Sequence, residues 1–383
     1  MTSLIERRDI EHWEQESLAP YAAHASSSRG RVYPHSEHHL RTAFQRDRDR
    51  IIHSAAFRRM EYKTQVFLPH EADHFRTRLT HTIEVAQVSR TLARNLRLNE
   101  DLTEGIALAH DLGHTPFGHA GEDILNELLA GSGGFNHNRQ SLRVVDLLEQ
   151  RYAEHPGLNL SYEVREGIAK HETSVKVAGP EFEPNTWPTL EASLVDRVDE
   201  ITYNAHDVDD GVSSGLITLA EMADLSIWRE SATHPGLSLT AAPFAAWDND
   251  LQRRKAARFL IDTVAVDLLD EICRRIERLK LTDIDSVRLA SEPVCVYTEA
   301  MGARVRELKS FLGQKLYRHP HLRQRTDRAR EIVRVLYERF MGHPEQMPER
   351  FQEMLLTEKK EIVIADYIAG MTDRFAERLF DKG

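Results

Sequence analysis

The dipeptide His110-Asp111 is the strongest indication of chemistry in this sequence, because it places an imidazole beside a carboxylate. Neighbouring positions inside a helix point about 100° apart and rarely serve one site. Here the dipeptide ends an apolar helical run and Leu112-Gly113 follows it, so the backbone can bend and both side chains can turn toward one point. Imidazole and carboxylate together suit divalent cations such as Mn²⁺, Fe²⁺, Zn²⁺ or Mg²⁺. The dipeptide therefore predicts part of a metal site.

Two more residues are candidates to complete that site, because each places a metal-binding group on an apolar helical face. These residues are His81 and Asp199. A buried carboxylate without a partner is costly, and a metal ion offsets that cost. Each residue also has an ordinary alternative: a single helical histidine is more often packed or solvated than a ligand, and Asp199 would suit an ion pair with Arg197. Taken together, the pattern predicts a metal ion bound by His81, His110, Asp111 and Asp199.

The composition of the 383-residue chain is that of a globular protein with a sizeable core, since 41% of its residues are hydrophobic and 29% are charged. The net charge of −11 argues against nucleic-acid binding over the whole surface, although a local basic groove is compatible with it. The two cysteines fit a reducing cytoplasm better than a disulfide framework. The charged N-terminal stretch lacks a signal-peptide core, and no stretch approaches the roughly 20 apolar residues of a membrane span. We therefore expect a cytoplasmic protein that does not enter the membrane.

Helical periodicity dominates the chain, and no alternating pattern is long enough for a sheet. We therefore predict an all-α fold of mostly antiparallel helices. The expected helices cover residues 41–60, 78–98, 99–113, 139–151, 161–171 and 190–206, with an almost continuous helical region after residue 250. Residues 230–250 are expected to form a loop, and residues 294–301 are ambiguous.

Several longer motifs surround the metal candidates. They are RLTHTIEV (78–85), HDLGHTPFGHAGE (110–122), FNHNRQS (135–141) and DEITYNAHDVDDG (199–211), with FQRDRDRIIHSAAFRRMEYKTQVF (44–67) upstream and LKSFLGQKLYRHP (308–320) downstream. Together they resemble the HD superfamily, and more narrowly its dGTP triphosphohydrolase (dGTPase) and dGTPase-like branch. A bare pattern of one histidine, an HD pair and one aspartate is only moderately specific, whereas HDLGHTPFGHAGE combined with KTQVF is highly specific.

The resemblance implies an all-helical HD-domain fold with additional C-terminal helices. We divide the chain into an N-terminal arm (1–45), an HD phosphohydrolase core (46–215) and a C-terminal helical region packed on the core (216–383). Because residues 1–40 are polar and rich in Ser, His and Arg, we expect them to form a loosely held arm with one short helix. The resemblance also implies one divalent metal ion per site, held by the four ligands named above. Mn²⁺ or Mg²⁺ is the first expectation, and Zn²⁺, Fe²⁺, Co²⁺ or Ni²⁺ would suit the same ligands.

The resemblance also implies a reaction and roles for four residues around the metal site. Family enzymes hydrolyse a deoxynucleoside triphosphate at the bond between the α-phosphorus and O5′, and release inorganic triphosphate. His119 and Glu122 match the catalytic histidine–acid pair, and they share a helical face if a helix begins near Phe117. His114 and His137 match histidines beside the α-phosphate.

Substrate contacts are implied in the same way. Arg78 matches an arginine that contacts the triphosphate. Gln65, Tyr203 and Asp207 match residues that line the deoxyribose, select against a 2′-OH and hold the 3′-OH. Some bacterial dGTPases have Asn at the position of His114, whereas animal relatives have His. The preferred base among the dNTPs therefore stays open.

Two alternatives to a dNTP triphosphohydrolase also stay open at this point. One is another HD phosphohydrolase that acts on nucleoside monophosphates, cyclic nucleotides or alarmones. The other is a nucleotide-binding regulatory oligomer with little activity. KTQVF, Tyr203 and Asp207 argue against the first, and the presence of His119 and Glu122 argues against the second. Relatives suggest a homo-oligomer (dimer or hexamer) and activation by a second nucleotide, while a nucleic-acid effector is compatible with the sequence but not indicated by it. Roles for Lys309, Lys315 and Tyr317 are left open.

Overall fold

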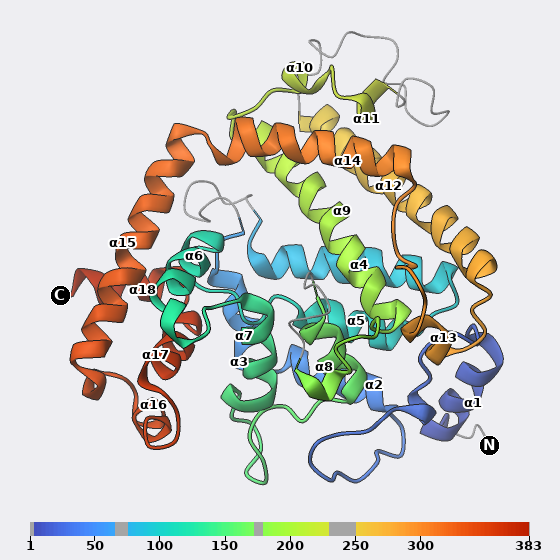
Figure 1. The fold of residues 1–383 in the computed structure, drawn as a ribbon, viewed down its shortest axis with the longest axis horizontal. Coiled ribbons are helices and arrows are strands. Elements are labelled where there is room, and N and C mark those ends of the chain that lie inside the picture. Colours follow the sequence, from blue (N-terminus) through green and yellow to red (C-terminus); the bar gives the residue numbers. More distant parts are fainter. Residues whose placement is uncertain (1–3, 66–75, 172–178, 230–249, 383) are drawn as a thin grey trace. The chain divides into compact units, whose positions relative to one another are not determined.

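The computed structural model describes residues 4–65, 76–171, 179–229 and 250–382 (Figure 1). Within these residues the chain is helical and contains no β-strand, so the predicted all-α fold is confirmed. No helix in this part of the chain is both long and apolar enough to cross a membrane. The predicted loop over 230–250 lies almost wholly outside the described residues, and so do Val66 and Phe67 of the KTQVF motif.

The described chain forms two compact units. The first comprises Met1–Val195, Thr282–Ser291 and Thr326–Gly383, and the second comprises Asp196–Leu281 and Glu292–Arg325. The long helix α9 (Leu190–Ser213) begins in the first unit and continues into the second. The three segments expected from the sequence do not coincide with these units, because residues after 325 return to the first one. Those segments, with boundaries after residues 45 and 215, stay a prediction.

The helices of the first unit are α1 (Arg7–Ser17), α2 (Ala43–Ile52), α3 (Ala55–Arg59), α4 (Arg78–Asn95), α5 (Glu100–Ala109), α6 (His119–Leu128), α7 (His137–Arg143), α8 (Tyr162–Ala169), the start of α9, α13 (Ile284–Arg288), most of α15 (Pro320–Gly342), α16 (Glu349–Met354), α17 (Lys360–Ala369) and α18 (Asp373–Asp381). The second unit holds the rest of α9, α10 (Leu219–Met222), α11 (Ser226–Arg229), α12 (Asp250–Leu279), α14 (Glu299–Leu312) and the start of α15.

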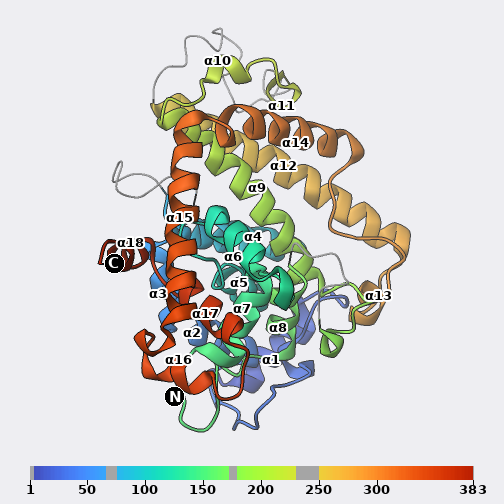
Figure 2. The same cartoon turned by 60° about the vertical axis from the view of Figure 1, so that its left-hand side comes forward.

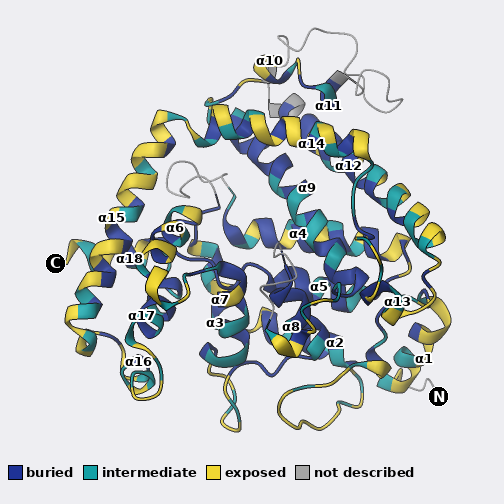
Figure 3. Ribbon diagram, viewed as in Figure 1, coloured by how far each residue is buried: buried dark blue, intermediate teal, exposed yellow. Residues whose placement is uncertain are grey.

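Helix α5 is the central helix of the first unit and packs against α2, α4 and α8. It begins at Asn99, whose side chain accepts a hydrogen bond from the Leu102 amide and caps the helix. Its apolar residues Leu102 and Ile106 are fully buried, and each stabilises the fold by about 1.5–3 kcal/mol. Figure 3 shows α5 as an almost wholly buried helix. The end of α5, which carries His110, is therefore held rigidly by this packing.

The C-terminal helices pack on α6. Ile124 and Leu125 of α6 share one buried apolar cluster with Leu336 of α15 and Ile364 of α17, and these helices lie together in both ribbon views (Figures 1 and 2). A buried carboxylate, Asp366, adds polar contacts from Arg143 at 2.5 Å and Gln140 at 2.9 Å, both on α7. The C-terminal segment of the first unit thus supports the helices that carry His119 and His137.

The N-terminal arm is more firmly held than the sequence suggested. Its apolar residues Ala22 and Ala23 are buried, and the Ala23 amide donates to the Glu191 carboxylate at 2.9 Å. The same carboxylate accepts a hydrogen bond from the Asn99 amide at 3.1 Å, so it joins the arm to the start of α5. The expectation of a loosely held arm is therefore wrong. The cause is a buried carboxylate whose backbone partners are distant in sequence.

Candidate metal and phosphate site

His110 and Asp111 occupy the end of α5, as the dipeptide predicts. The helix ends at Ala109, and His110 follows as its C-terminal cap. The His110 ring donates from Nδ1 to the Ala107 carbonyl oxygen at 2.6 Å, and the His110 carbonyl accepts from the Ser141 hydroxyl at 2.7 Å. Both the ring and the backbone of His110 are therefore fixed in place.

Gly113 allows α7 to approach this helix end closely. A Cβ atom at Gly113 would lie 2.1 Å from the Ser141 nitrogen and 2.4 Å from the His137 carbonyl oxygen. We expect Gly113→Ala to lower the free energy of unfolding by about 3 kcal/mol or more, because backbone atoms would have to move. Urea denaturation would measure this loss. Gly131→Ala is the matched control, since its Cβ would meet nothing within 4 Å, and equal stability losses in both variants would contradict the packing argument.

His81 projects from α4 toward His110. Both rings are buried, and their centroids lie 6.0 Å apart in an edge-on arrangement. A third buried ring, that of His171, lies 5.0 Å from the His110 ring. His171 follows α8 and was not singled out from the sequence. Its proximity depends on the packing of α8 against α5, which no local pattern reveals.

The ligand chemistry of this cluster fits a divalent metal ion. Because His110 Nδ1 donates to the Ala107 carbonyl oxygen, Nε2 is the ring atom that is left to bind a metal ion when the ring is neutral. That Nε2 atom lies 3.5 Å from Asp111 Oδ1. A cation bound near this nitrogen and this oxygen would be stabilised by both atoms. Two imidazoles and a carboxylate on rigid elements are a suitable set of metal ligands.

Arg78, the first residue of α4, forms a buried ion pair with Asp111. Its guanidinium donates to Asp111 Oδ2 at 2.7 Å, and the two side chains are 3% and 5% exposed. Burial alone would raise the pKa of Asp111, but Arg78 together with His110 and His114 holds that pKa well below its ordinary value. Asp111 is therefore a carboxylate at neutral pH, as a metal ligand must be.

His114 and His137 form a stacked pair beside Asp111. Their rings lie 4.0 Å apart and 17° from parallel, and His114 Nε2 lies 3.2 Å from Asp111 Oδ1. Burial and the charge of Arg78 hold the pKa of His114 well below its ordinary value. Asp111, His114 and His137 therefore form a second group of possible metal ligands, whose ligand atoms all lie within 4.8 Å of one another.

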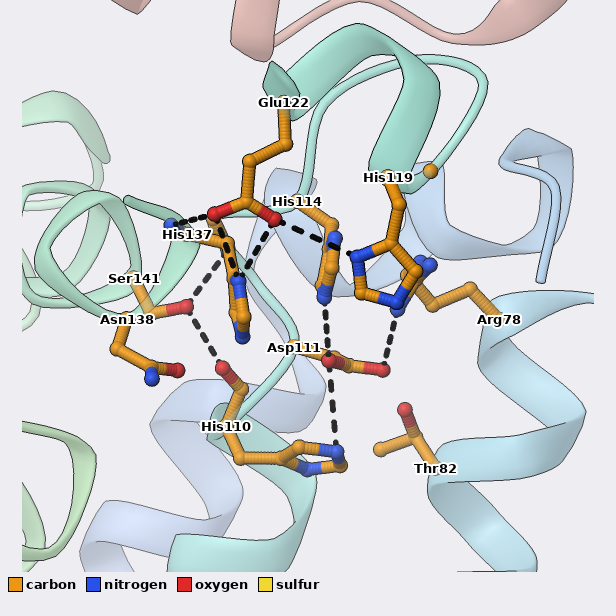
Figure 4. A network of polar contacts seen from close by, with 12 residues as sticks. Arg78, Thr82, His110, Asp111, His114, His119, Glu122, His137, Asn138 and Ser141 are labelled. Atoms are coloured by element: carbon orange, nitrogen blue, oxygen red, sulfur yellow. Dashed lines mark hydrogen bonds and ion pairs between the residues drawn. The ribbon is translucent and has the colours of Figure 1, made fainter. Parts of the chain in front are cut away.

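Glu122, on the first turn of α6, connects these histidines to His119. Its carboxylate accepts from His137 Nδ1 at 2.9 Å and from the His137 amide at 2.8 Å, whereas His119 Nδ1 lies at 3.6 Å (Figure 4). Burial would raise the pKa of Glu122, but hydrogen bonds from His119 and His137 lower it further than burial raises it. The expected His119–Glu122 pair is present, and its carboxylate is held more closely by His137.

The helix that carries His119 begins where the spacing predicts. Helix α6 starts at His119 after Gly118, and the His119 side chain is 61% exposed. The preceding Phe117 amide donates to Asp373 of α18 at 2.9 Å, and the same carboxylate accepts from the Thr64 amide at 2.9 Å. Asp373 thus joins the loop before α6 to the segment that leads to Gln65.

Gln65 lies at the edge of this region. Its side chain is buried, and its Oε1 atom accepts no hydrogen bond from the residues that the structure describes. The neighbouring Lys63 donates to the carbonyl oxygens of His114 at 2.5 Å and Ala369 at 2.8 Å. Burial and nearby arginines lower the pKa of Lys63 to about 7. Lys63 therefore holds the His114 backbone, while the Gln65 oxygen is available to a ligand.

The remaining expected residues lie on the part of α9 that belongs to the second unit. Asp199, Tyr203 and Asp207 are spaced by four residues, which places them on one face of the helix. The hydroxyl of Tyr317 donates to the Asp207 carboxylate, and the rings of Tyr203 and Tyr317 lie 6.4 Å apart. Burial and the charge of Asp207 raise the pKa of both tyrosines well above the ordinary value. Tyr317, left without a role by the sequence, belongs to this cluster.

The two lysines near Tyr317 form ion pairs with glutamates and do not contact the Tyr203–Asp207–Tyr317 cluster through these pairs. Lys309 pairs with Glu200 at 2.8 Å, and Lys315 pairs with Glu221 at 3.2 Å. Both lysines are about half exposed, at 50% and 53% of the side chain. These ion pairs join α14 and the turn after it to α9 and α10 within the second unit, and each is worth little stability because it is exposed.

Two family models match the chain. The model described as the HD domain matches residues 78–204, and the model described as the phosphohydrolase-associated domain matches residues 295–382. The fold and the site thus define a phosphohydrolase of the metal-dependent HD class. Relatives that match nearly the whole chain identify one family within this class.

Relatives named deoxyguanosinetriphosphate triphosphohydrolase-like protein match the chain over its length. The protein from Geobacter metallireducens is 47% identical over 100% of this chain and 99% of its own. The protein from Geobacter sulfurreducens is 45% identical over 99% of each chain, and the one from Azoarcus sp. is 48% identical over 96% of this chain and 97% of its own. The chain therefore belongs to the deoxyguanosinetriphosphate triphosphohydrolase-like family, as its motifs predict.

Proposed function

We propose that this protein hydrolyses deoxynucleoside triphosphates, dGTP or dNTPs generally, to a deoxynucleoside and inorganic triphosphate with one divalent metal ion. One observation carries the proposal. Asp111 lies 3.2 Å from His114, which stacks on His137, which in turn donates to Glu122 at 2.9 Å. The metal-ligand cluster therefore continues directly into a network of histidines and a carboxylate. Such a continuous arrangement suits an anionic substrate whose phosphorus is attacked by water.

In this proposal His81, His110, Asp111 and Asp199 hold the metal ion. The ion would be Mn²⁺ or Mg²⁺ first, with Zn²⁺, Fe²⁺, Co²⁺ and Ni²⁺ as further possibilities. When bound, it would supply neutralisation of phosphate charge and a lower pKa for a water molecule. Asp199 lies on α9, at the position that the family motif assigns to the fourth ligand.

The cationic side of the site comes from Arg78 and the stacked histidines. Arg78 is fixed by Asp111, so its remaining guanidinium donors are oriented before a substrate arrives. His114 Nδ1 is buried and has no hydrogen-bond partner among the described residues. A phosphate oxygen at this atom would favour the protonated ring, so substrate binding would raise the pKa of His114. His114 would then donate to the α-phosphate.

His119 and Glu122 would carry out the proton transfer to the leaving O5′ atom. The net reaction adds water oxygen to the α-phosphorus and breaks its bond to O5′, and O5′ must gain a proton as it leaves. His119 is exposed enough to reach a substrate, and Glu122 lies within 3.6 Å to favour its charged form. His119 therefore protonates O5′, while Glu122 and His137 orient it.

Sugar recognition gives a separate prediction. Tyr203 and Asp207 would pack against the deoxyribose and bond its 3′-OH. Replacing Tyr203 by Ala would leave room for a 2′-OH, so we expect the preference for dGTP over GTP, measured as a ratio of kcat/KM values, to fall about 10–100-fold. Tyr317→Phe is the matched comparison, because it keeps the aromatic ring near Tyr203 and removes only the donor to Asp207. An unchanged ratio in Tyr203→Ala would contradict this role.

Product analysis tests the proposal. Each dNTP would be supplied singly and then all four together, with Mn²⁺ or Mg²⁺, and the phosphate product would be identified by ion chromatography. Inorganic triphosphate is the expected product, and activity only in mixtures would indicate a second nucleotide site. Pyrophosphate or orthophosphate as the first product would contradict the proposal. Assembly into a dimer or hexamer and a cytoplasmic location stay predictions, and light scattering would measure the first.

A further inference from the structure

A second polar pocket lies on α2, outside the cluster described above. Its volume is about 250 Å³, and it is formed by α2, the segment before it and the residues after α7. Four arginines line it: Arg41, Arg46, Arg50 and Arg151. One carboxylate, that of Asp49, accompanies them. No metal-ligand candidate lines this pocket, so it requires its own explanation.

Most of this positive charge is not neutralised by carboxylates. Of these four arginines, Arg41 alone forms an ion pair among the described residues, at 2.5 Å to Asp49, which Arg48 also approaches at 3.8 Å. Arg46 donates to the Ser36 carbonyl at 2.8 Å, and Arg151 donates to the His53 carbonyl at 2.7 Å. Arg50 donates to two backbone carbonyls at 2.6 Å each. Among the residues that the structure describes, these last three arginines make no ion pair with a carboxylate.

The two innermost arginines are strongly desolvated. Arg46 is 8% exposed and Arg50 is 5% exposed. Burial, followed by the charge of Arg31, lowers the pKa of each below its ordinary value. Arg31 itself pairs with Asp47, so that carboxylate is already engaged. Concentrated positive charge that is buried is costly, and an anion would stabilise it.

Aromatic rings border the same pocket. Arg50 lies over the Tyr152 ring, with its central carbon 5.1 Å from the ring centroid. The His155 ring lies 4.9 Å from Tyr152 and stacks on Tyr33 at 5.3 Å. These rings hold Tyr152 in place as one wall of the pocket. A rigid wall beside four guanidiniums gives the shape of a preformed anion site.

We propose that the pocket formed by Arg41, Arg46, Arg50 and Arg151 binds a phosphate group of a small anion. Guanidiniums match phosphate oxygens in geometry as well as charge, and three of these arginines are held by backbone carbonyls that keep them oriented. The volume admits a phosphate or short polyphosphate. The anion is either an inorganic polyphosphate or the phosphate chain of a free nucleotide, which share this chemistry.

Calorimetric titration of the full chain in EDTA would test the pocket, with inorganic triphosphate as the probe. Arg41→Gln and Arg151→Gln remove exposed guanidiniums and should each weaken binding about tenfold. Asp49→Asn removes the competing carboxylate and should tighten binding about threefold to tenfold. A gain of affinity is diagnostic, because a merely structural disturbance would weaken binding. Circular dichroism would check that each variant is folded.

Arg274→Gln is the matched control, because Arg274 is also an exposed helical arginine with one carboxylate partner, Glu271 at 3.0 Å. Unchanged affinity in this variant supports the pocket. Equal affinities in all variants, or no binding at millimolar triphosphate, would overturn the proposal. This assay uses no metal and no turnover, so its failure would leave the proposed hydrolase activity untouched.

A second titration would distinguish the two sources of phosphate. A dNTP that binds more tightly than triphosphate, with the same response to Asp49→Asn, identifies a nucleotide as the ligand. Equal affinities identify the phosphate chain alone. An oligodeoxynucleotide that binds more tightly than either small anion, and loses that binding in Arg41→Gln, would contradict a small-anion site.

Discussion

Replacing Asp111 by Ala is expected to abolish metal-dependent hydrolysis and to lower the free energy of unfolding by about 3–5 kcal/mol. Activity should be lost because Asp111 is one of the four residues that we propose to hold the metal ion. Stability is lost because Arg78, 3% exposed and bonded to Asp111 at 2.7 Å, would be left as an unpaired buried charge. Turnover assays and urea denaturation would measure these two effects, and mass spectrometry would measure the metal content.

A paired variant separates these two effects. Arg78→Leu combined with Asp111→Ala removes both charges and should recover most of the lost stability, since replacing a whole buried ion pair by apolar side chains is often nearly neutral. It should recover no activity and no bound metal. If Asp111→Ala alone keeps full metal content, Asp111 is not a ligand, and its role is confined to holding Arg78.

Replacing His119 by Ala is expected to lower kcat by about 10²–10⁴ with little change in stability. The side chain is 61% exposed and contributes little to packing, so its removal isolates proton transfer. Glu122→Gln should lower kcat similarly and also reduce stability, because Glu122 accepts hydrogen bonds from the His137 amide and ring. Steady-state kinetics would measure kcat, and thermal denaturation would measure the stability, of both variants.

The pH dependence of kcat should identify the group that transfers the proton. His119 and His137 hold the pKa of Glu122 well below its ordinary value, so Glu122 stays ionised throughout the range in which the enzyme is assayed. No limb of the profile between pH 5 and pH 9 therefore reports this carboxylate. Loss of the alkaline limb in His119→Ala would identify His119 as the acid. Full kcat in His119→Ala would instead give that role to His137.

The sequence predicts the supporting helices of the site well, because their determinants are local. The spacing of apolar residues places a helix over 78–98, and α4 covers Arg78–Asn95. The His110-Asp111 dipeptide was expected at a helix end, and α5 ends one residue before it. Capping residues and periodicity act within a few positions, so a single sequence contains them.

The contacts that complete the clusters were not predictable in the same way. Glu122 was expected to serve His119, three residues earlier, and lies closer to His137, fifteen residues later. Tyr317 bonds to Asp207 across 110 positions, and the inclusion of His171 depends on how α8 packs. These contacts arise from loop paths and helix packing. Periodicity alone contains no information about either.

The position of the broken bond tests the central claim most directly. Hydrolysis of dGTP would be run in water enriched in ¹⁸O with Mn²⁺, and the products would be weighed by mass spectrometry. Attack at the α-phosphorus with loss of O5′ predicts one ¹⁸O atom in inorganic triphosphate and none in the deoxynucleoside. Label in orthophosphate, in pyrophosphate or in the deoxynucleoside would contradict the proposed reaction.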